Sequence, residues 1–369
     1  MLEAFQPNAL RRATWALALT LVAPLWGCVG PGHALPKWES LRMTSLVTGT
    51  EASLRGIAAW DAQVIWASGS AGTYLHTTDG GESWTVGQIP GLEQRDLRDI
   101  HLFGPRRALV LVVGSPAELW LTNDAGLHWE LIHRLEHPDA FMDSMDFWPN
   151  GQGLCFGDPI EGAFTLWRSD HSGRNWSGLP AESLPAPRDK EAGFAASGTL
   201  VRCLAGGRAM IATGGGAARV LVTQDYGDTW SAYETPMAQG GAATGSFSLG
   251  LGMGSQALLV GGDYTDPERR TGSAAYSSDA GRTWRPSAEP QPGYRSCIQA
   301  LPGCAPGTWL AVGKGGASLT EDGGVHWRDL NLDGHYCMAF APSMGPAGCT
   351  AFLAGANGRM SRLEIPCVR

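Results

Sequence analysis

Acidic and basic side chains that could carry out chemistry recur in the middle of the chain. Asp143 and Asp158 are candidates for a general acid and base acting on a glycan, provided that burial or mutual repulsion raises the pKa of one carboxyl. Arg98, Arg219 and Arg295 could hold an anionic ligand through paired hydrogen bonds. Alternatively, all these groups are solvated loop charges and ion pairs between neighbouring structural units. Which alternative holds depends on the elements that position the residues.

A short box recurs six times along the chain, at residues 77–84, 122–129, 169–176, 223–230, 277–284 and 320–327. Five copies read Ser/Thr-x-Asp-x-Gly-x-x-Trp, and in the third copy His171 replaces the aspartate. In such a box the carboxylate can accept backbone N–H groups of its own turn, glycine supplies positive φ, and tryptophan buries a large apolar area. We therefore predict that the box aspartates hold turns rather than bind ligands. These residues are Asp79, Asp124, Asp225, Asp279 and Asp322.

The spacing of the boxes predicts the fold. Successive box tryptophans are 45, 47, 54, 54 and 43 residues apart, a period typical of four-stranded propeller blades. A seventh unit, residues 335–363, ends before a tryptophan strand, whereas Trp38 lies 46 residues before Trp84. Residues 36–43 can therefore supply the missing outer strand and remove two exposed sheet edges. We predict an all-β protein, a seven-bladed β-propeller of four-stranded antiparallel blades with N-to-C strand closure, which forms a single domain over residues 35–369.

In such a propeller, the loops between the second and third strands and the loops between blades gather on one face around the axis. These loops are rich in charged and aromatic residues, which would face one funnel. The residues predicted to bind a ligand there are Arg98, Asp99, Asp143, Asp158, Arg219, Asp263, Tyr264, Arg295 and Lys314. In the enzyme alternative, Asp143 and Asp158 of this set would be catalytic.

The boxes resemble those of the BNR or Asp-box propellers over nearly all of the chain that follows the first 34 residues. The number of boxes and the short blades make the sequence most similar to the group named after the photosystem II stability and assembly factor. The resemblance implies a seven-bladed fold and an exported scaffold that works by protein contact, with an envelope protein or a membrane-protein complex as its partner. The arginines associated with that factor's interaction surface have no counterpart here that can be placed by motif.

An enzyme is the alternative, because sialidases also contain Asp-boxes. Resemblance to sialidases would imply an Arg-Ile-Pro motif near the first blade, whereas this chain has Gln88-Ile89-Pro90, which lacks the arginine and follows the first box. The sequence also contains no nucleophile elbow, zinc-protease motif, P-loop or dinucleotide-binding glycine motif. We therefore expect no cofactor. A carbohydrate-active enzyme that uses funnel carboxylates on a glycan remains as the alternative function.

The charge balance narrows the class of partner. The chain has 369 residues, 17% of them charged, and a formal net charge of −8. Nucleic acids and anionic lipids are bound through basic surfaces, so neither is expected as the main partner.

The first 34 residues are typical of an export leader. Arg11 and Arg12 precede an apolar stretch, residues 13–26, which has about the length of a signal-peptide core. The segment that ends at Cys28 resembles a bacterial lipobox, in which Cys28 would be lipidated; cleavage after Ala34 is the alternative. Both alternatives predict an exported protein, which is either periplasmic or attached to the membrane through a lipid anchor alone.

Seven further cysteines follow Cys28, and in an oxidising compartment they could form disulfides. Close spacing suggests the pairs Cys297 with Cys304 and Cys337 with Cys349. None of the cysteines has the spacing of a CxxC or Cys/His motif, so the sequence predicts no metal site.

Overall fold

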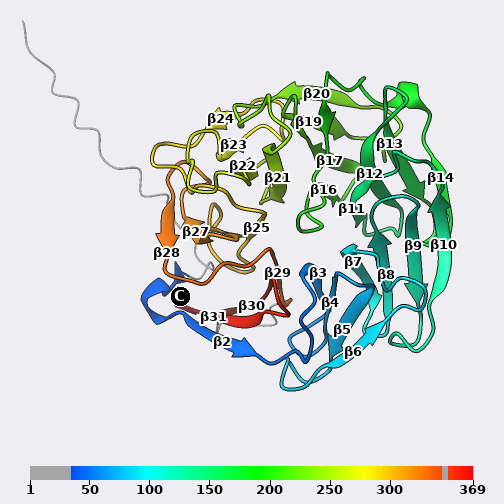
Figure 1. Cartoon of the computed structure of the whole chain (residues 1–369). Helices are drawn as coiled ribbons and strands as arrows, with labels where there is room; N and C mark the ends of the chain where they lie inside the picture. Colours follow the sequence, from blue (N-terminus) through cyan, green and yellow to red (C-terminus); the bar gives the residue numbers. More distant parts are fainter. Residues whose placement is uncertain (1–34, 343–347, 369) are drawn as a thin grey trace, which may run out of the picture.

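The computed structural model describes residues 35–342 and 348–368. Seven antiparallel sheets surround a central axis, and each contains the four strands of a propeller blade (Figure 1). The chain is therefore a seven-bladed β-propeller, which confirms the fold predicted from the box spacing. The leader and Cys28 lie outside the described residues. Within the described part of the chain, no helix is long and apolar enough to cross a bilayer.

Six blades are built from strands in chain order, with the first strand nearest the axis (Figure 1). The first three blades consist of β3 (Leu54–Ala59), β4 (Ile65–Gly69), β5 (Thr73–Thr77), β6 (Thr85–Gln88), β7 (Leu97–Gly104), β8 (Arg107–Val112), β9 (Ala117–Thr122), β10 (Glu130–Leu135), β11 (Met142–Phe147), β12 (Gly153–Ile160), β13 (Ala163–Ser169) and β14 (Trp176–Gly178).

The fourth to sixth blades follow the same order. They consist of β16 (Val201–Leu204), β17 (Arg208–Ala212), β19 (Arg219–Thr223), β20 (Ser231–Glu234), β21 (Thr244–Leu251), β22 (Ala257–Asp263), β23 (Ala274–Ser277), β24 (Arg285–Pro286), β25 (Cys297–Ala300), β26 (Trp309–Gly313), β27 (Gly316–Thr320) and β28 (Arg328–Leu330). Two short strands, β18 (Gly214–Gly215) and β15 (Glu191–Ala192), extend the sheet of the fifth blade beyond β21. A 3-10 turn, η2 (Ala181–Ser183), precedes β15.

The middle strands of the blades form the core because each blade packs against a neighbour on both faces. Every residue of β4, β26 and β27 is buried, whereas the rim strands β6 and β28 are largely exposed. Strands buried on both faces read in sequence as continuous apolar runs rather than as an alternation. The apolar side chains between blades, including Trp66 and Trp309, supply the main stabilising free energy.

The box carboxylates accept hydrogen bonds within their own turns, each of which connects the third and fourth strands of a blade. Oδ2 of Asp79 accepts the Ser83 hydroxyl at 2.5 Å, and Oδ1 accepts the Thr77 hydroxyl at 2.6 Å and the Ser83 backbone N–H at 3.0 Å. These bonds, the first of them most strongly, lower the pKa of Asp79 to about 2. The Thr77 oxygen in turn accepts the Gly81 N–H at 3.0 Å. The same pattern occurs at Asp124, Asp225, Asp279 and Asp322.

The third box keeps half of this arrangement. The Ser169 hydroxyl still accepts the Gly173 N–H at 3.0 Å, although His171 replaces the aspartate. The His171 carbonyl accepts the Arg174 N–H at 3.1 Å and so closes the turn through the backbone.

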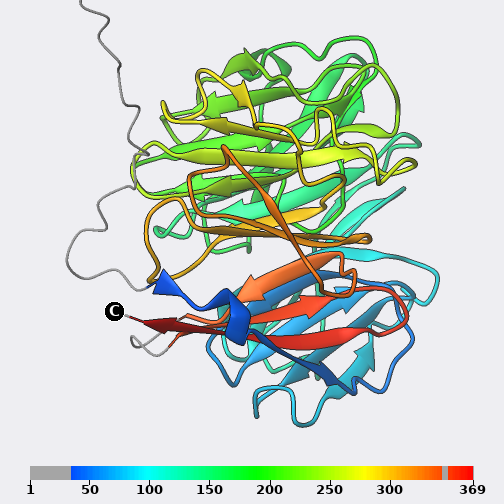
Figure 2. The same ribbon diagram turned by 90° about the vertical axis from the view of Figure 1, so that its left-hand side faces the viewer.

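The N-terminal and C-terminal segments close the ring in the seventh blade, which contains β29 (Cys337–Phe340), β30 (Gly348–Ala354) and β31 (Met360–Val368). Its fourth strand is β2 (Arg42–Leu46), antiparallel to β31, and β1 (Leu35–Pro36) pairs with the far end of β31. Figure 2 shows these N-terminal strands, in blue, lying beside the red C-terminal strand. The predicted N-to-C closure is therefore confirmed.

The closing strand begins later than the predicted segment, residues 36–43, because the chain turns inward at Trp38. A 3-10 turn, η1 (Trp38–Ser40), separates β1 from β2. Trp38 is 8% exposed in an apolar cluster shared by the sixth and seventh blades, and its Nε1 donates to Glu321 Oε1 at 2.7 Å. The tryptophan therefore fastens the closure from inside rather than lying in the outer strand.

The two cysteine pairs suggested by spacing are wrong, because the strands hold their members apart. Cys297 lies at one end of β25, opposite Val312, whereas Cys304 lies in the loop beyond the other end. Cys337 lies opposite Ala354, five residues along β30 from Cys349.

We expect Trp38→Ala to lower the free energy of unfolding by about 3–5 kcal/mol, as is usual when a buried tryptophan is removed. Chemical denaturation measures the change. Trp60→Ala is the control, because Trp60 is 43% exposed, and it should leave the unfolding midpoint nearly unchanged. Equal stability of the Trp38 variant and the parent protein would contradict this account of the closure.

Candidate functional site

A cavity of about 530 Å³ opens on the axial face where the predicted loops gather. Loops between blades, loops between second and third strands, and the first residues of inner strands form its wall. The lining residues are Arg55, Arg98, Phe141, Asp158, Ala192, Gly193, Phe194, Ala195, Ala196, Ala242, Phe247, Tyr264, Tyr294, Lys314 and Tyr336. The volume lies within the range of ligand-binding pockets.

Aromatic rings form the apolar part of the cavity. The rings of Phe194 and Phe247 stack with their centroids 3.9 Å apart. Tyr294 and Tyr264 meet Phe247 edge-on, at centroid distances of 5.0 Å and 6.0 Å. Burial raises the pKa of the Tyr294 hydroxyl, which therefore stays neutral near neutral pH. The surface suits an apolar or aromatic group of a ligand.

Three cationic side chains border these rings. The Arg55 guanidinium lies 4.1 Å from the centroid of the Tyr336 ring, and the Lys314 ammonium donates to the Tyr264 carbonyl oxygen. Arg98 forms an ion pair with Asp96 at 2.8 Å and donates to the Ala195 carbonyl at 3.2 Å. Burial, and then the charge of Arg98, lower the pKa of Arg55. Neither Arg55 nor Lys314 forms an ion pair with any residue that the structure describes.

The two candidate catalytic carboxylates lie on either side of Gly193. Asp158 lines the cavity, and its Oδ1 accepts the Gly193 N–H at 2.8 Å. Asp143 is completely buried, and neither of its oxygens has a hydrogen-bond partner of ordinary geometry among the described residues. Burial, and then repulsion from Asp158, raise the pKa of Asp143 well above its usual value. Burial also raises the pKa of Asp158. A carboxyl that is covered in this way cannot contact a ligand in the cavity.

The segment that covers these acids is residues 191–199, which we call the axial segment. A side chain on Gly193 would place its Cβ 2.2 Å from Asp143 Oδ2, and one on Gly198, at φ +68°, would place it 2.1 Å from Asp99 Oδ1. Both positions therefore require glycine. The Ser197 hydroxyl donates across the ring to the Ser296 carbonyl at 2.7 Å, so the axial segment closes the centre of the propeller beneath the cavity.

Asp99 lies under the axial segment and does not reach the cavity. Its Oδ1 accepts the Ile100 N–H at 2.8 Å and its Oδ2 accepts the Met145 N–H at 2.7 Å, so it links the second and third blades. Burial raises the pKa of Asp99 to about 8, despite these hydrogen bonds.

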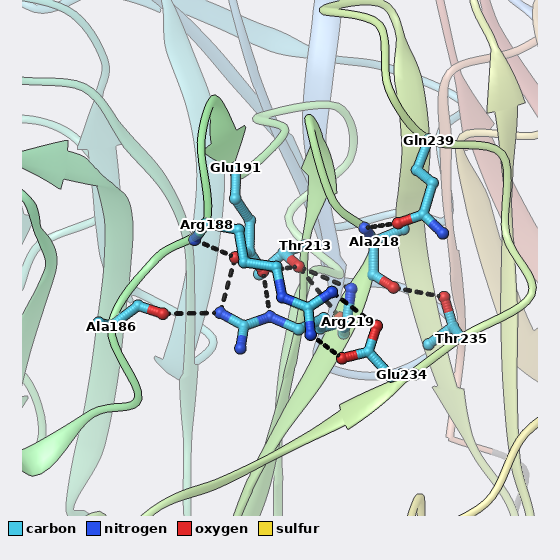
Figure 3. A network of polar contacts seen from close by, with 9 residues as sticks. All are labelled: Ala186, Arg188, Glu191, Thr213, Ala218, Arg219, Glu234, Thr235 and Gln239. Atoms are coloured by element: carbon cyan, nitrogen blue, oxygen red, sulfur yellow. Dashed lines mark hydrogen bonds and ion pairs between the residues drawn. The ribbon is translucent and has the colours of Figure 1, made fainter.

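Arg219 anchors the start of the axial segment (Figure 3). Its Nη2 lies 2.7 Å from Glu191 Oε2 and its Nε lies 3.0 Å from Glu191 Oε1, both within the protein interior. The Thr213 hydroxyl donates to Glu191 Oε1 at 2.6 Å, and the Arg188 N–H donates to Glu191 Oε2 at 2.8 Å. The Nε and Nη2 groups of Arg219 are thus engaged within the protein, and Arg219 does not line the cavity.

Two other predicted binding residues are also engaged elsewhere. Arg295 donates to the Ser318 hydroxyl at 2.7 Å and pairs with Asp329 at 3.2 Å, at the base of the sixth blade. Asp263 accepts the Thr265 N–H at 2.9 Å and so shapes the loop that presents the neighbouring Tyr264. Of the nine predicted residues, the cavity is lined by Arg98, Asp158, Tyr264 and Lys314.

Bulges at the start of inner strands explain which side chains reach the axis. The register shifts between Leu54 and Gly56 in β3, and likewise around Arg98 in β7, Asp143 in β11 and Phe247 in β21. Such a bulge re-aims the extra residue. Arg55 occupies this position in the first blade but was not predicted as a binding residue. The sequence feature that could have identified Arg55 is the Leu-Arg pair, which occurs at residues 54–55 and again at residues 97–98.

The comparisons with known proteins identify the fold. No family model and no curated protein matches the sequence. Among solved structures, YCF48 bound to D1 peptide has 16% identity and a TM-score of 0.60, with 90% of this chain and 98% of that chain covered. YCF48 from Cyanidioschyzon merolae has 14% identity and a TM-score of 0.58, covering 87% of this chain and 98% of that chain. The Pan2 WD40 domain from Neurospora crassa has 13% identity and a TM-score of 0.58, covering 85% and 90%. At these identities the likeness shows the propeller fold alone.

The raised pKa of Asp143 gives a pH-dependent contribution to stability. The folded carboxyl keeps its proton where the unfolded one, with a pKa of 3.8, has lost it. Between the two pKa values the native state binds more protons than the unfolded state. The contribution of Asp143 to the free energy of unfolding is therefore fully present below the unfolded pKa. It falls by about 1.4 kcal/mol per pH unit until the folded pKa is passed. Asp143→Asn removes the titration, and its stability relative to the parent protein should rise as the pH increases from about 4, until the folded pKa of Asp143 is passed.

Urea unfolding at a series of pH values measures this difference. Asp139→Asn is the matched control, because the Asp139 side chain is 77% exposed in the same region, and its difference from the parent protein should stay flat. A flat difference for Asp143→Asn would show that Asp143 is ionised in the folded protein.

Proposed function

We propose that this protein is a binding scaffold that captures a segment of a partner polypeptide in the axial cavity during assembly of an envelope or membrane-protein complex. The observation that carries the proposal is the pairing of cations with an aromatic surface. Arg55 and Lys314, which have no carboxylate partner among the described residues, lie beside the stacked rings of Phe194 and Phe247.

The charges in the cavity favour a ligand that carries a carboxylate. The chain as a whole has a formal charge of −8, yet Arg55, Arg98 and Lys314 meet in one cavity. A guanidinium that is partly removed from water gains most from an anionic partner with which it can form charge-assisted hydrogen bonds. An acidic side chain or a free C-terminus beside an apolar side chain would match the two parts of the surface.

The similarity to solved propellers supports a polypeptide ligand. One of the similar structures is YCF48 bound to a D1 peptide, which is a propeller of comparable extent holding a peptide. The sequence resemblance to the photosystem II stability and assembly factor group points in the same direction. We therefore favour an envelope protein or a membrane-protein complex over a free small molecule as the partner.

The carbohydrate-active alternative is less well supported by the geometry. General acid and base catalysis on a glycosidic bond requires two carboxyl groups facing the substrate. Asp158 lines the cavity, whereas Asp143 is completely covered by the axial segment. The binding experiment below therefore also tests whether the ligand is a glycan.

Export and lipidation at Cys28 are part of the proposal, since a scaffold for an envelope complex has to leave the cytoplasm. The leader sequence supports this location. We expect the native protein to fractionate with membranes and Cys28→Ala to be released into the soluble envelope fraction. Mass spectrometry of the mature N-terminus checks the lipid. A chain that retains residues 1–27 in the cytoplasm would contradict export.

Binding of short peptides tests the proposed ligand. We expect an array to select peptides with a carboxylate beside an apolar residue, and amidated or Asn/Gln versions of them to bind more weakly. Arg55→Ala and Lys314→Ala should each weaken binding by about 10-fold to 100-fold, the usual effect of losing a charged hydrogen bond. Fluorescence anisotropy at low and high salt measures the affinities, and high salt should weaken binding.

Arg285→Ala is the matched control, because Arg285 is exposed on β24 at the rim and should not affect affinity. Peptide binding that is unchanged in both cavity variants would exclude the cavity as the site. If the parent protein bound glycans but no peptides, and the two cavity variants lost glycan binding, the carbohydrate alternative would be favoured.

A further inference from the structure

Three cysteines from separate segments meet at the seam between the sixth and seventh blades. Cys304 lies in the loop between β25 and β26, Cys349 in β30 and Cys367 in β31. The Sγ atom of Cys304 is 3.9 Å from that of Cys349 and 3.4 Å from that of Cys367, and all three sulfurs lie within 4.8 Å of one another. We call this group the thiol cluster.

The spacing of the thiol cluster matches three ligands around one centre. Metal–thiolate bonds are about 2.3 Å long, so three sulfurs around a trigonal metal are about 4.0 Å apart. The separations of 3.9 Å and 3.4 Å from Cys304 lie close to this value, and the third separation is within 4.8 Å. A disulfide would use two of the sulfurs and leave the third unpaired, whereas one central cation uses all three.

The surroundings favour a soft cation with few ligands. Cys304 and Cys349 are 5% and 3% exposed, in an apolar cluster that includes Leu301 and Ile365. No histidine, aspartate or glutamate of the described residues joins the three sulfurs within the same spacing. Structural zinc requires four ligands, while Cu(I) is held by soft thiolates and accepts three.

Two clefts give access to the thiol cluster. Cys304 lines a cleft of about 290 Å³ together with Pro302 and Pro306. Cys349 lines a second cleft of about 280 Å³. An ion can therefore approach the sulfurs from solvent without unfolding the blade.

We propose that Cys304, Cys349 and Cys367 bind one Cu(I) ion as three thiolates. Each sulfur exchanges its S–H bond for an S–Cu bond and releases one proton to solvent, with no change in the oxidation state of copper or sulfur. The Cys349 thiol, 2.8 Å from the Pro302 carbonyl oxygen, gives up that hydrogen bond on binding. Because binding of the three thiolates displaces protons, the ion binds more weakly as the pH falls.

The bound ion would reinforce the ring closure. Cys367 lies opposite Pro36, in the part of β31 that pairs with β1, and Cys304 belongs to the neighbouring blade. Copper would therefore join the sixth blade to β31, the C-terminal strand that pairs with both β1 and β2. Ligands that bind the folded state alone raise the melting temperature, so Cu(I) should raise it.

Competition for Cu(I) tests the proposal on the reduced full chain without oxygen. We titrate Cu(I) against a coloured Cu(I) chelator, follow the melting temperature, and record the copper X-ray absorption spectrum. We expect one ion per chain, three sulfur neighbours at about 2.3 Å and no nitrogen or oxygen neighbour. Cys304→Ala, Cys349→Ala and Cys367→Ala should each abolish the copper-dependent rise in melting temperature. Cys155→Ala is the control, because Cys155 is buried in another blade and should preserve it.

Three results would overturn the proposal. The first is loss of all copper to the chelator, and the second is a spectrum with nitrogen or oxygen neighbours. The third is a disulfide between any two of the three cysteines in protein purified without reductant, found by peptide mass mapping. The absorption spectrum of the parent protein decides the question even if a variant fails to fold.

Discussion

The pairing of β31 with both N-terminal strands is the interaction on which the rest of the structure depends. A propeller blade buries its two faces against neighbouring blades, so an open ring would expose two apolar faces and two sheet edges. Leu35 pairs with Val368 at one end of the C-terminal strand, and Leu46 pairs with Met360 at the other end. This closure brings loops from all parts of the chain to one face. The axial cavity, whose lining extends from Arg55 to Tyr336, exists because the ring is closed.

The axial segment is the second constraint, because it converts a channel into a cavity with a floor. It is anchored at one end by the buried ion pair of Glu191 with Arg219, and it crosses the centre of the ring to contact Ser296. In doing so it covers Asp99 and Asp143, two carboxyls that would be ionised in water. Buried polar groups that break the usual rules occur mainly at functional positions, where other interactions offset the free-energy cost of burial. Here burial raises the pKa of both covered acids, which favours their protonated forms.

The sequence predicted the fold well because the boxes act locally. Each box specifies its own turn, as the bonds of Asp79 show, and the repeat of these turns gives the blade number and strand order. The position of the closing strand was less accurate, since the inward turn at Trp38 depends on Glu321 from a distant blade. The sequence could not predict which charged residues line the cavity and which are paired inside the protein. Tertiary packing selects such partners, as it pairs Glu191 with Arg219. The thiol cluster has the same origin, since its members are brought together by the seam between blades.

The neutral acids and the cations of the cavity form one electrostatic system. If Asp143 were ionised beneath the floor, its charge would offset those of Arg55 and Arg98 and repel a ligand carboxylate. Its burial favours the protonated form and so reduces the negative charge beneath the cavity. Asp158 is the remaining acid in the wall, and its pKa is already raised by burial. A ligand carboxylate placed beside Asp158 would raise that pKa further, so binding of the proposed ligand is linked to uptake of a proton. The site would therefore hold its ligand more tightly as the pH falls, as long as the ligand itself stays ionised.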